Sequence, residues 1–358
     1  MSETSSLILP GRLGDPNLSL RDDSRADPRM IKIMDELGLL EEVLLPVSVH
    51  SNIDDILSFL TAAEEGYEAL NNAVTSSWPP TLGVDRQTRV IKGIDDNEIT
   101  LYIHQPEEST NPMPGILHLH GGGMALMSAE GSLYNHWRND LAATGLTVIG
   151  AEFRNSSGKL GPHPFPAGLN DCSSALRWMV ENKAELGISG IVISGESGGG
   201  NLSLATCLKA KFDRRVDTIN GVYAQCPSVS NRYVDKDPSL PSLVENDELG
   251  LSCAMMAALY KTYDPSAENA SNPLAWPLHA TEEDLKGLPP HFISVCQLDP
   301  LRDEGIAYTK KLIDAGVPAS SRTINGVTHA GDMSYRSAMP EIYHSSLYDI
   351  KSFADSVC

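Results

Sequence analysis

The sequence predicts an α/β fold, with a mostly parallel eight-stranded sheet, helices on both of its faces and a helical cap. Two observations lead to this prediction. Segments of strand character alternate with segments of helical character from residue 88 onward. One of the strands runs into a glycine-rich turn with a serine at its centre, and a helical segment follows at once. Two stretches without strand pattern, 1–86 and 228–272, are expected to form the cap.

Eight segments are expected to form strands. The first two, 88–92 and 99–103, flank a turn and predict an antiparallel hairpin. The other six are short apolar runs at 114–120, 146–150, 191–194, 221–226, 291–296 and 321–324. Helices are expected at 171–185, after the glycine-rich turn, at 305–315 and after Pro340. Such alternation is typical of a parallel sheet that is covered on both faces.

The two cap stretches differ in composition. Apolar residues at helical spacing in 29–34 and 53–60 predict helices in the first stretch. The second is acidic and rich in loops, with one helix expected at 253–263. We therefore divide the chain into four parts: an N-terminal cap segment (1–86), a first core part (87–227), an inserted cap segment (228–272) and a second core part (273–358).

Composition excludes several classes of function. The formal net charge of −20 argues against binding to nucleic acids or to anionic membranes, because both require basic surface. No window approaches the roughly 18 consecutive apolar residues of a membrane span, and residues 1–6 lack the basic start of a signal peptide. The six cysteines form no C-x-x-C pair and have no histidine at ligand spacing, which indicates buried thiols in a reducing compartment. We expect a cytoplasmic protein.

The glycine-rich turn, Gly195-Glu196-Ser197-Gly198-Gly199, has the spacing Gly-x-Ser-x-Gly between a strand and a helix. A serine at the tip of such a turn is held in a strained backbone conformation, and glycines two residues away on either side let strand and helix close. The hydroxyl then stands above the sheet beside a helix N-terminus, where developing negative charge is favoured. Ser197 is therefore the candidate nucleophile.

A serine hydroxyl needs a base, and the base needs an orienting carboxylate. His329 follows the last predicted strand, at the sheet edge where ligands bind; the alternative, His344, falls inside the expected terminal helix. Asp299 directly follows the preceding strand, whereas the alternative, Asp303, is better placed to cap the next helix. The residues thus favour Ser197, Asp299 and His329, in the chain order nucleophile, acid, base.

An oxyanion needs N–H donors that are already in place. The sequence His120-Gly121-Gly122-Gly123 follows an early strand, and backbone without side chains lets two amides turn toward one point. Gly198, after the serine, supplies a third amide.

These motifs together resemble the bacterial hormone-sensitive-lipase-like family of α/β-hydrolase carboxylesterases. The matching residues are His120-Gly121-Gly122-Gly123, residues 163–171, Gly195 to Asn201, Asp299 to Gly305, and His329. Segments 153–155 and 163–166 are, within that family, similar to the brefeldin A esterase type. The resemblance implies an α/β-hydrolase fold and an esterase for short- to medium-chain acyl esters. It also implies a triad of Ser197, Asp299 and His329, and an oxyanion hole formed by the amides of Gly122, Gly123 and Gly198.

The chain departs from the family pattern near the site. Glu196-Ser197-Gly198 stands where Asp-Ser-Ala is usual, Met124 where an aromatic residue is common, and Ala330-Gly331 where Gly-Phe is frequent. These differences suggest a less aromatic and wider pocket. Met124, Met255 and Met256, together with Met127, are candidates for an adaptable apolar substrate pocket; the alternative is that each is ordinary core.

We therefore expect a serine carboxylesterase that acts on a small-molecule ester or lactone through an acyl-enzyme, with neither metal nor organic cofactor. Three alternatives stay open: an amidase or peptidase on the same fold, a true lipase, and a non-catalytic ligand receptor. The acidic stretch 229–247 does not look like an apolar lipase lid, and receptors on this fold typically lack the histidine that this chain has. No nucleic-acid or membrane partner is expected, and a homodimer is an open alternative to a monomer.

Overall fold

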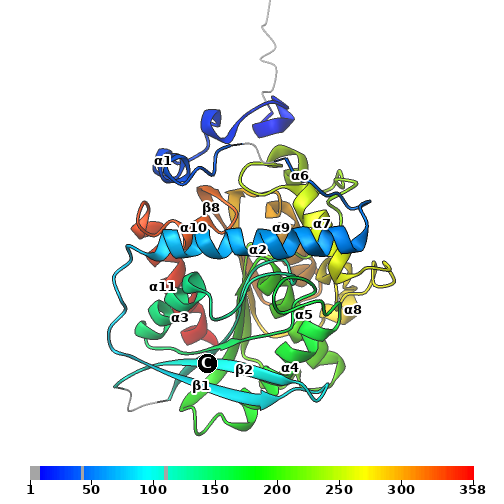
Figure 1. Ribbon diagram of the computed structural model, residues 1–358. Helices are drawn as coiled ribbons and strands as arrows, with labels where there is room; N and C mark the ends of the chain where they lie inside the picture. Colours follow the sequence, from blue (N-terminus) through cyan, green and yellow to red (C-terminus); the bar gives the residue numbers. More distant parts are fainter. Residues whose placement is uncertain (1–8, 42–43, 109–111) are drawn as a thin grey trace, which may run out of the picture.

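The computed structural model describes residues 9–41, 44–108 and 112–358. Eight strands form one sheet in the order β1-β2-β4-β3-β5-β6-β7-β8 (Figure 1). β1 pairs antiparallel with β2 and β2 with β4, whereas all other neighbours are parallel. The strands are β1 (Val84–Lys92), β2 (Glu98–Pro106), β3 (Met113–Leu119), β4 (Thr147–Ala151), β5 (Ile188–Glu196), β6 (Gly221–Gln225), β7 (His291–Leu298) and β8 (Ala319–Thr328). The predicted eight-stranded, mostly parallel sheet is confirmed.

Burial explains why the central strands are almost wholly apolar. Every residue of β4 and β6 is buried, because helices cover both faces of the sheet there. β1, at one edge, is exposed along most of its length and carries polar and charged residues. The predicted antiparallel hairpin is confirmed as β1–β2.

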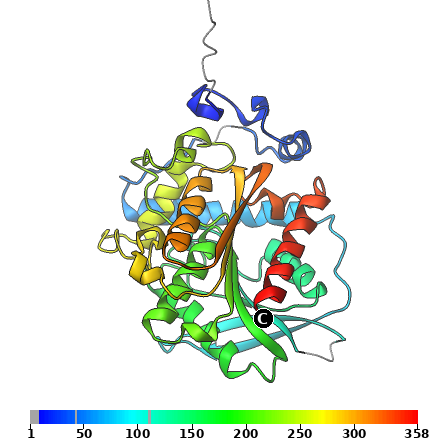
Figure 2. The same cartoon turned by 180° about the vertical axis from the view of Figure 1, so that it is seen from behind.

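Helices cover the two faces of the sheet (Figures 1 and 2). One face carries α3 (Ser132–Ala143) and α11 (Pro340–Val357), which contribute to a core cluster that includes Trp137 and Tyr343. The other carries α4 (Ala167–Glu181), α5 (Gly198–Phe212) and α9 (Arg302–Asp314), which belong to the largest core cluster. Helix α3 is missing from the prediction, although its apolar residues lie at helical spacing.

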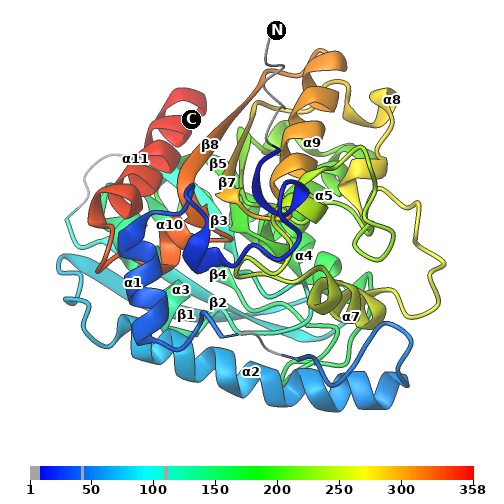
Figure 3. The ribbon, with the colours of Figure 1, turned by 90° about the horizontal axis from the view of Figure 1, so that it is seen from above.

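The segments predicted as cap contain four further α-helices in the described residues. The N-terminal cap segment holds α1 (Pro28–Glu36) and α2 (Ile53–Thr75), and the inserted cap segment holds α6 (Ser242–Glu245) and α7 (Cys253–Tyr263). Two further short helices, α8 (Glu282–Leu285) and α10 (Gly331–Ser334), belong to the core parts. Seen from above, α2 runs along one side of the molecule and α7 lies beside one of its ends (Figure 3).

An ion-pair cluster joins both cap segments to the core. Glu245 of α6 accepts from Arg302 at 2.8 Å on each of its oxygens, and it also pairs with Arg25. Asp23 neighbours Arg25 at 2.6 Å. Because these side chains are largely buried, the pairs are less screened than surface ion pairs.

Most predicted elements are confirmed, with shifted ends. The helix expected at 171–185 is α4, which begins and ends four residues earlier. The helix expected at 253–263 matches α7. β1 begins at Val84, inside the stretch assigned to the N-terminal cap segment, and β8 is longer than the expected 321–324. The chain start, on which the signal-peptide argument rests, lies outside the described residues. Among the helices described, none has both the length and the apolar character needed to cross a membrane.

Candidate active site

Ser197 lies at the tip of the turn between β5 and α5. Its φ of 56° places it in a conformation that L-residues rarely adopt, and its N–H donates to Gln225 O at 2.9 Å. Added Cβ atoms at Gly195 and Gly199 would lie 2.4 and 1.9 Å from Leu119 O. The close approach of β3 therefore requires both glycines of the motif.

His329 and Asp299 are hydrogen-bonded at the same sheet edge. His329 follows β8, Asp299 follows β7, and His329 Nδ1 donates to Asp299 Oδ2 at 2.7 Å. The other oxygen of Asp299 accepts from Leu301 N at 2.9 Å, and the carboxylate is fully buried. Both oxygens of Asp299 thus accept a hydrogen bond. The bond to His329 holds the imidazole with Nδ1 as donor and leaves Nε2 free to accept a proton.

Two other titratable candidates lie elsewhere. His344 is exposed on α11. Asp303 accepts from Ser242 N at 2.7 Å and pairs with Arg302, so its carboxylate holds the inserted cap segment. The expected helix-capping role of Asp303 is wrong, because α9 is preceded by Leu301, which makes no side-chain cap.

We expect the acid limb of the pH–rate profile to have its midpoint above pH 6.5. Burial lowers the pKa of His329, but the charges and hydrogen bonds of Asp299 and Cys226, with the Asp299 charge the largest of these, raise the pKa well above 6.5. A protonated imidazole cannot accept the serine proton, so activity is present above this pKa and is lost as pH falls through it. The kcat/KM of a p-nitrophenyl ester, measured between pH 5 and 9, tests this; a midpoint clearly below 6.5 would contradict it.

The amides predicted for the oxyanion hole lie beside the serine turn. We call residues 120–131, between β3 and α3, the glycine loop. An added Cβ at Gly198 would lie 2.7 Å from Gly123 N and 2.5 Å from Met124 N, which shows how closely the turn and the loop approach. Within the part of the chain that the structure describes, the N–H groups of Gly122 and Gly123 donate to no acceptor. Gly123 is buried and Gly122 is half-buried, and two unpaired amides in succession are suited to a bound anion.

Glu196 holds the start of the glycine loop. Its Oε1 accepts from Gly121 N at 2.8 Å, and its Oε2 accepts from His118 Nε2 at 3.1 Å. The side chain is only 2% exposed. The residue that precedes the serine therefore links the serine turn to the loop that carries the free amides.

Comparisons with known proteins identify the family of this chain. The family model described as alpha/beta hydrolase fold matches residues 116–332. Carboxylesterase NlhH of Mycobacterium tuberculosis is 32% identical over 246 residues, which are 66% of this chain and 72% of that protein. An arylesterase of Saccharolobus solfataricus is 31% identical over 292 residues, which are 80% of this chain and 89% of that protein. The chain belongs to the α/β-hydrolase family.

A solved structure extends the likeness over nearly the whole chain. It is described as brefeldin A esterase, a bacterial homologue of human hormone sensitive lipase, and it is 40% identical with a TM-score of 0.94. The match covers 97% of this chain and 98% of that one. The resemblance to the hormone-sensitive-lipase-like carboxylesterases is thereby confirmed, and this hydrolase is an esterase of that family.

Three groups in this hydrolase site were missed by the sequence reasoning. Asn246 Nδ2 donates to Gln297 O at 3.0 Å and to Asp299 O at 3.1 Å, so the inserted cap segment holds the acid turn. Cys226 follows β6, between the strands that carry Ser197 and Asp299.

Glu64, from α2, accepts from Met127 N in the glycine loop. Asn246 and Cys226 carry no sequence signal for these contacts. Glu64 carries a signal for burial only, because it continues the buried stripe of Ile56 and Leu60 at a spacing of four residues.

Cys226, Asp299 and His329 form a group with metal-ligand chemistry. One ligand atom from each lies within 4.8 Å of the others. However, Asp299 Oδ2 and His329 Nδ1 bond to each other, and Asp299 Oδ1 is occupied by Leu301 N. The arrangement therefore favours an acid–base pair over a metal centre.

The candidate pocket methionines come from two elements. Met124 lies in the glycine loop and Met255 and Met256 lie in α7, and all three belong to the largest core cluster. An added Cβ at Gly123 would lie 2.9 Å from Leu259 Cδ1, so α7 packs directly on the loop.

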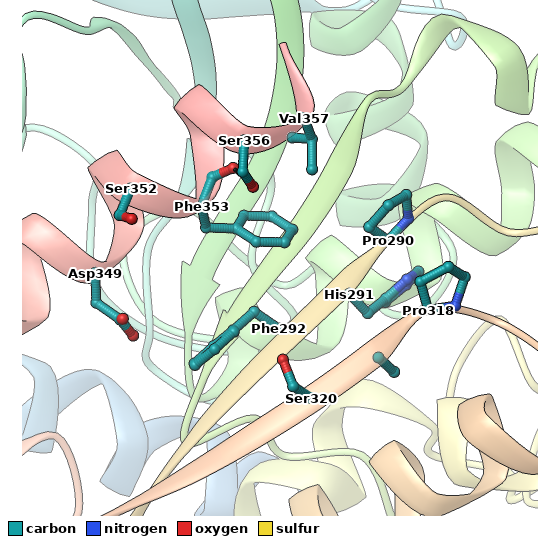
Figure 4. Close-up of a pocket in the computed structure, with 11 residues that line it drawn as sticks. Pro290, His291, Phe292, Pro318, Ser320, Asp349, Ser352, Phe353, Ser356 and Val357 are labelled. Carbon is teal, nitrogen blue, oxygen red and sulfur yellow. Dashed lines mark hydrogen bonds between the residues drawn. The ribbon is translucent and has the colours of Figure 1, made fainter.

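A groove of about 600 Å³ lies away from this chemistry (Figure 4). It is lined by the beginnings of β7 and β8 and by α11, with Phe292 and Phe353 among its apolar residues. Asp299 and His329 follow the opposite ends of the same two strands, so this groove is not the candidate ester site.

Proposed function

We propose that this protein is a serine carboxylesterase that hydrolyses short- to medium-chain acyl or lactone esters through Ser197, His329 and Asp299. The observation that carries the proposal is the hydrogen bond from His329 to the buried Asp299, at the sheet edge where Ser197 stands on a strained turn. Nucleophile, base and orienting carboxylate thus follow parallel strands of one sheet.

In the first half-reaction, Ser197 Oγ attacks the ester carbonyl carbon while His329 Nε2 takes the hydroxyl proton. The charge of Asp299 stabilises the imidazolium that forms. The amides of Gly122, Gly123 and Gly198 receive the oxyanion of the tetrahedral intermediate, and the start of α5 at Gly198 adds its positive end. His329 then gives its proton to the departing alcohol, which leaves the acyl group on Ser197.

In the second half-reaction, a water molecule replaces the alcohol. His329 accepts a proton from the water as its oxygen attacks the acyl carbon, and the same amides hold the second oxyanion. Collapse of this intermediate returns the proton to Ser197 Oγ and releases the carboxylic acid. All acid–base steps are performed by residues of this chain.

The cap segments and the methionines would set substrate size. Met124, Met255 and Met256 are unbranched and polarizable, and they can adapt to acyl or alcohol groups of different shape. Met124 belongs to the glycine loop, and Met255 and Met256 belong to α7, which packs on that loop at Gly123.

Hydrolysis of p-nitrophenyl acetate, butyrate, octanoate and palmitate, with Ser197→Ala as the blank, tests the proposal. We expect turnover of the short and medium chains, little turnover of palmitate, and little turnover of the matching p-nitroanilides, because amides are less reactive acyl donors. Preference for the anilides would favour an amidase. Absence of turnover by folded enzyme on every substrate would favour a ligand receptor and would contradict the esterase mechanism.

A cytoplasmic location and a homodimer remain predictions. The mass of the protein in solution decides the second: a monomer has a mass of 38.6 kDa, and a homodimer has twice that mass.

A further inference from the structure

Three backbone N–H groups of the glycine loop donate to carboxylates from three parts of the chain: α2, β5 and the residue that follows β4. The donors and acceptors are Gly121 to Glu196 at 2.8 Å, Met127 to Glu64 at 2.6 Å, and Ala129 to Glu152 at 2.7 Å. Charge-assisted bonds of this kind are about twice as strong as neutral ones. The free amides of Gly122 and Gly123 thus lie in a loop that is held on either side of them. Of the three carboxylates, only Glu64 comes from the cap.

Glu64 is a buried carboxylate on α2, with only 1% of its surface exposed. Its Oε1 accepts from Met127 N at 2.6 Å and its Oε2 accepts from Lys159 N at 2.7 Å. Both partners are donors, so both oxygens must be acceptors. In a glutamine at this position, the NH₂ group would face one of the two backbone N–H donors and could not accept from it. The carboxylate of Glu64 accepts from both donors.

The two segments that Glu64 joins are already paired with each other. Three bonds run from 155–157 to the glycine loop: Ser156 N to Met124 O at 2.9 Å, Ser157 N to Ala125 O at 3.1 Å, and Asn155 Nδ2 to Met127 O at 2.7 Å. Glu64 closes the end of this pairing. Gly158 leaves the room for it, since an added Cβ there would lie 2.5 Å from Glu64 Oε2.

The glycine loop needs such restraint because its backbone is strained. Gly122, Gly123, Met124 and Met127 have φ values of 101°, 64°, 58° and 75°. Non-glycine residues in this region, here Met124 and Met127, are strained and persist only where their surroundings fix them. Without the Glu64 acceptor, Met127 keeps the bond from Asn155 to its O but loses the bond of its N–H. Met124 and Met127 can then relax, and the amides of Gly122 and Gly123 move with them.

We propose that Glu64 is a positioning residue for ester hydrolysis, which holds the amides of Gly122 and Gly123 in the geometry that receives the oxyanion. This inference rests on the proposed function of those amides. Through Glu64, the N-terminal cap segment would affect the rate of the chemical step, in addition to any contact that it makes with the substrate. Glu64 does not touch the reacting atoms, and its effect passes through the Met127 N–H.

Glu64→Gln is the test, and Glu65→Gln is the matched control, because Glu65 is the exposed neighbour on the same helix. Loss of one oxyanion donor costs about 10²–10³ in kcat. For a displaced but present donor we expect kcat to fall by about 10–100-fold. The KM should stay within about twofold. The affinity for a trifluoromethyl ketone that forms a tetrahedral adduct should fall by the same factor as kcat/KM. The affinity for the product acid should be unchanged, and Glu65→Gln should match wild type.

Active-site titration with a phosphonate reports kcat per competent enzyme, so partial unfolding is not mistaken for slower chemistry. A normal kcat per titrated site, even with a lower unfolding temperature, would overturn the inference and leave Glu64 a purely structural group. A raised KM with unchanged kcat would also overturn it, in favour of a pocket-shaping role. Neither result would affect the proposed function, which fails separately if Ser197→Ala retains activity.

Discussion

Ser197→Ala is expected to lower kcat for p-nitrophenyl butyrate by about 10⁶-fold, the scale found when the nucleophile of a serine hydrolase is removed. The reason is geometric as well as chemical. Ser197 stands on a turn with φ 56°, between glycines that let β3 approach. The residual rate should reflect substrate binding and the oxyanion amides alone.

Mass spectrometry after treatment with a fluorophosphonate gives an independent check. We expect one adduct per chain, located in the peptide that contains Ser197, and none in Ser197→Ala. The variant should unfold at about the wild-type temperature, since the substitution removes one oxygen. An adduct on another residue, or turnover near the wild-type rate in the variant, would refute the assignment of the nucleophile.

Asp299→Asn is expected to reduce kcat by about 10⁴-fold, because an amide can donate to His329 Nδ1 and stabilise the tautomer that has its proton on Nε2. That tautomer cannot accept the Ser197 proton. The substitution also removes the charge that raises the His329 pKa, so the acid limb should move to lower pH than in wild type. The kcat/KM profile of both proteins between pH 5 and 9 measures the two effects together.

Asp303→Asn is the matched control for this carboxylate. Asp303 lies four residues further along the chain, and its contacts are with Ser242 N and Arg302. We expect a modest loss of stability and a kcat within about tenfold of wild type. A loss from Asp303→Asn as large as that from Asp299→Asn would contradict the assignment of the orienting acid.

The cap segments are joined to the candidate site through buried polar groups. Asn246, in the inserted cap segment, donates to the backbone of the Asp299 turn, and Glu64, in the N-terminal cap segment, accepts from the glycine loop. Glu245 binds Arg302, three residues beyond Asp299. Changes in either segment can therefore alter the Asp299 turn or the candidate oxyanion amides without contact with the substrate.

Local patterns were sufficient to predict the fold and the candidate triad. A Gly-x-Ser-x-Gly turn between strand and helix, a glycine triplet after an early strand, and Asp299 and His329 after the last two strands all depend on short-range signals. Because parallel strands bring their carboxyl ends to one edge, such residues meet without any knowledge of the loops between them. Element ends shifted by several residues, since terminal turns depend on packing as well as on local sequence.

The sequence by itself therefore determined the sheet, the order of the candidate catalytic residues and the family. Only the tertiary structure decided what holds them in place. The contact between Glu64 and Met127 joins residues 63 positions apart, and that between Asn246 and Asp299 joins residues 53 positions apart. A buried carboxylate or amide has no periodic pattern that names its partner. Its hydrogen-bond partner is whichever N–H or C=O group the folded chain brings within about 3 Å. For Glu64 and Asn246, that partner is determined by how the two cap segments pack against the core.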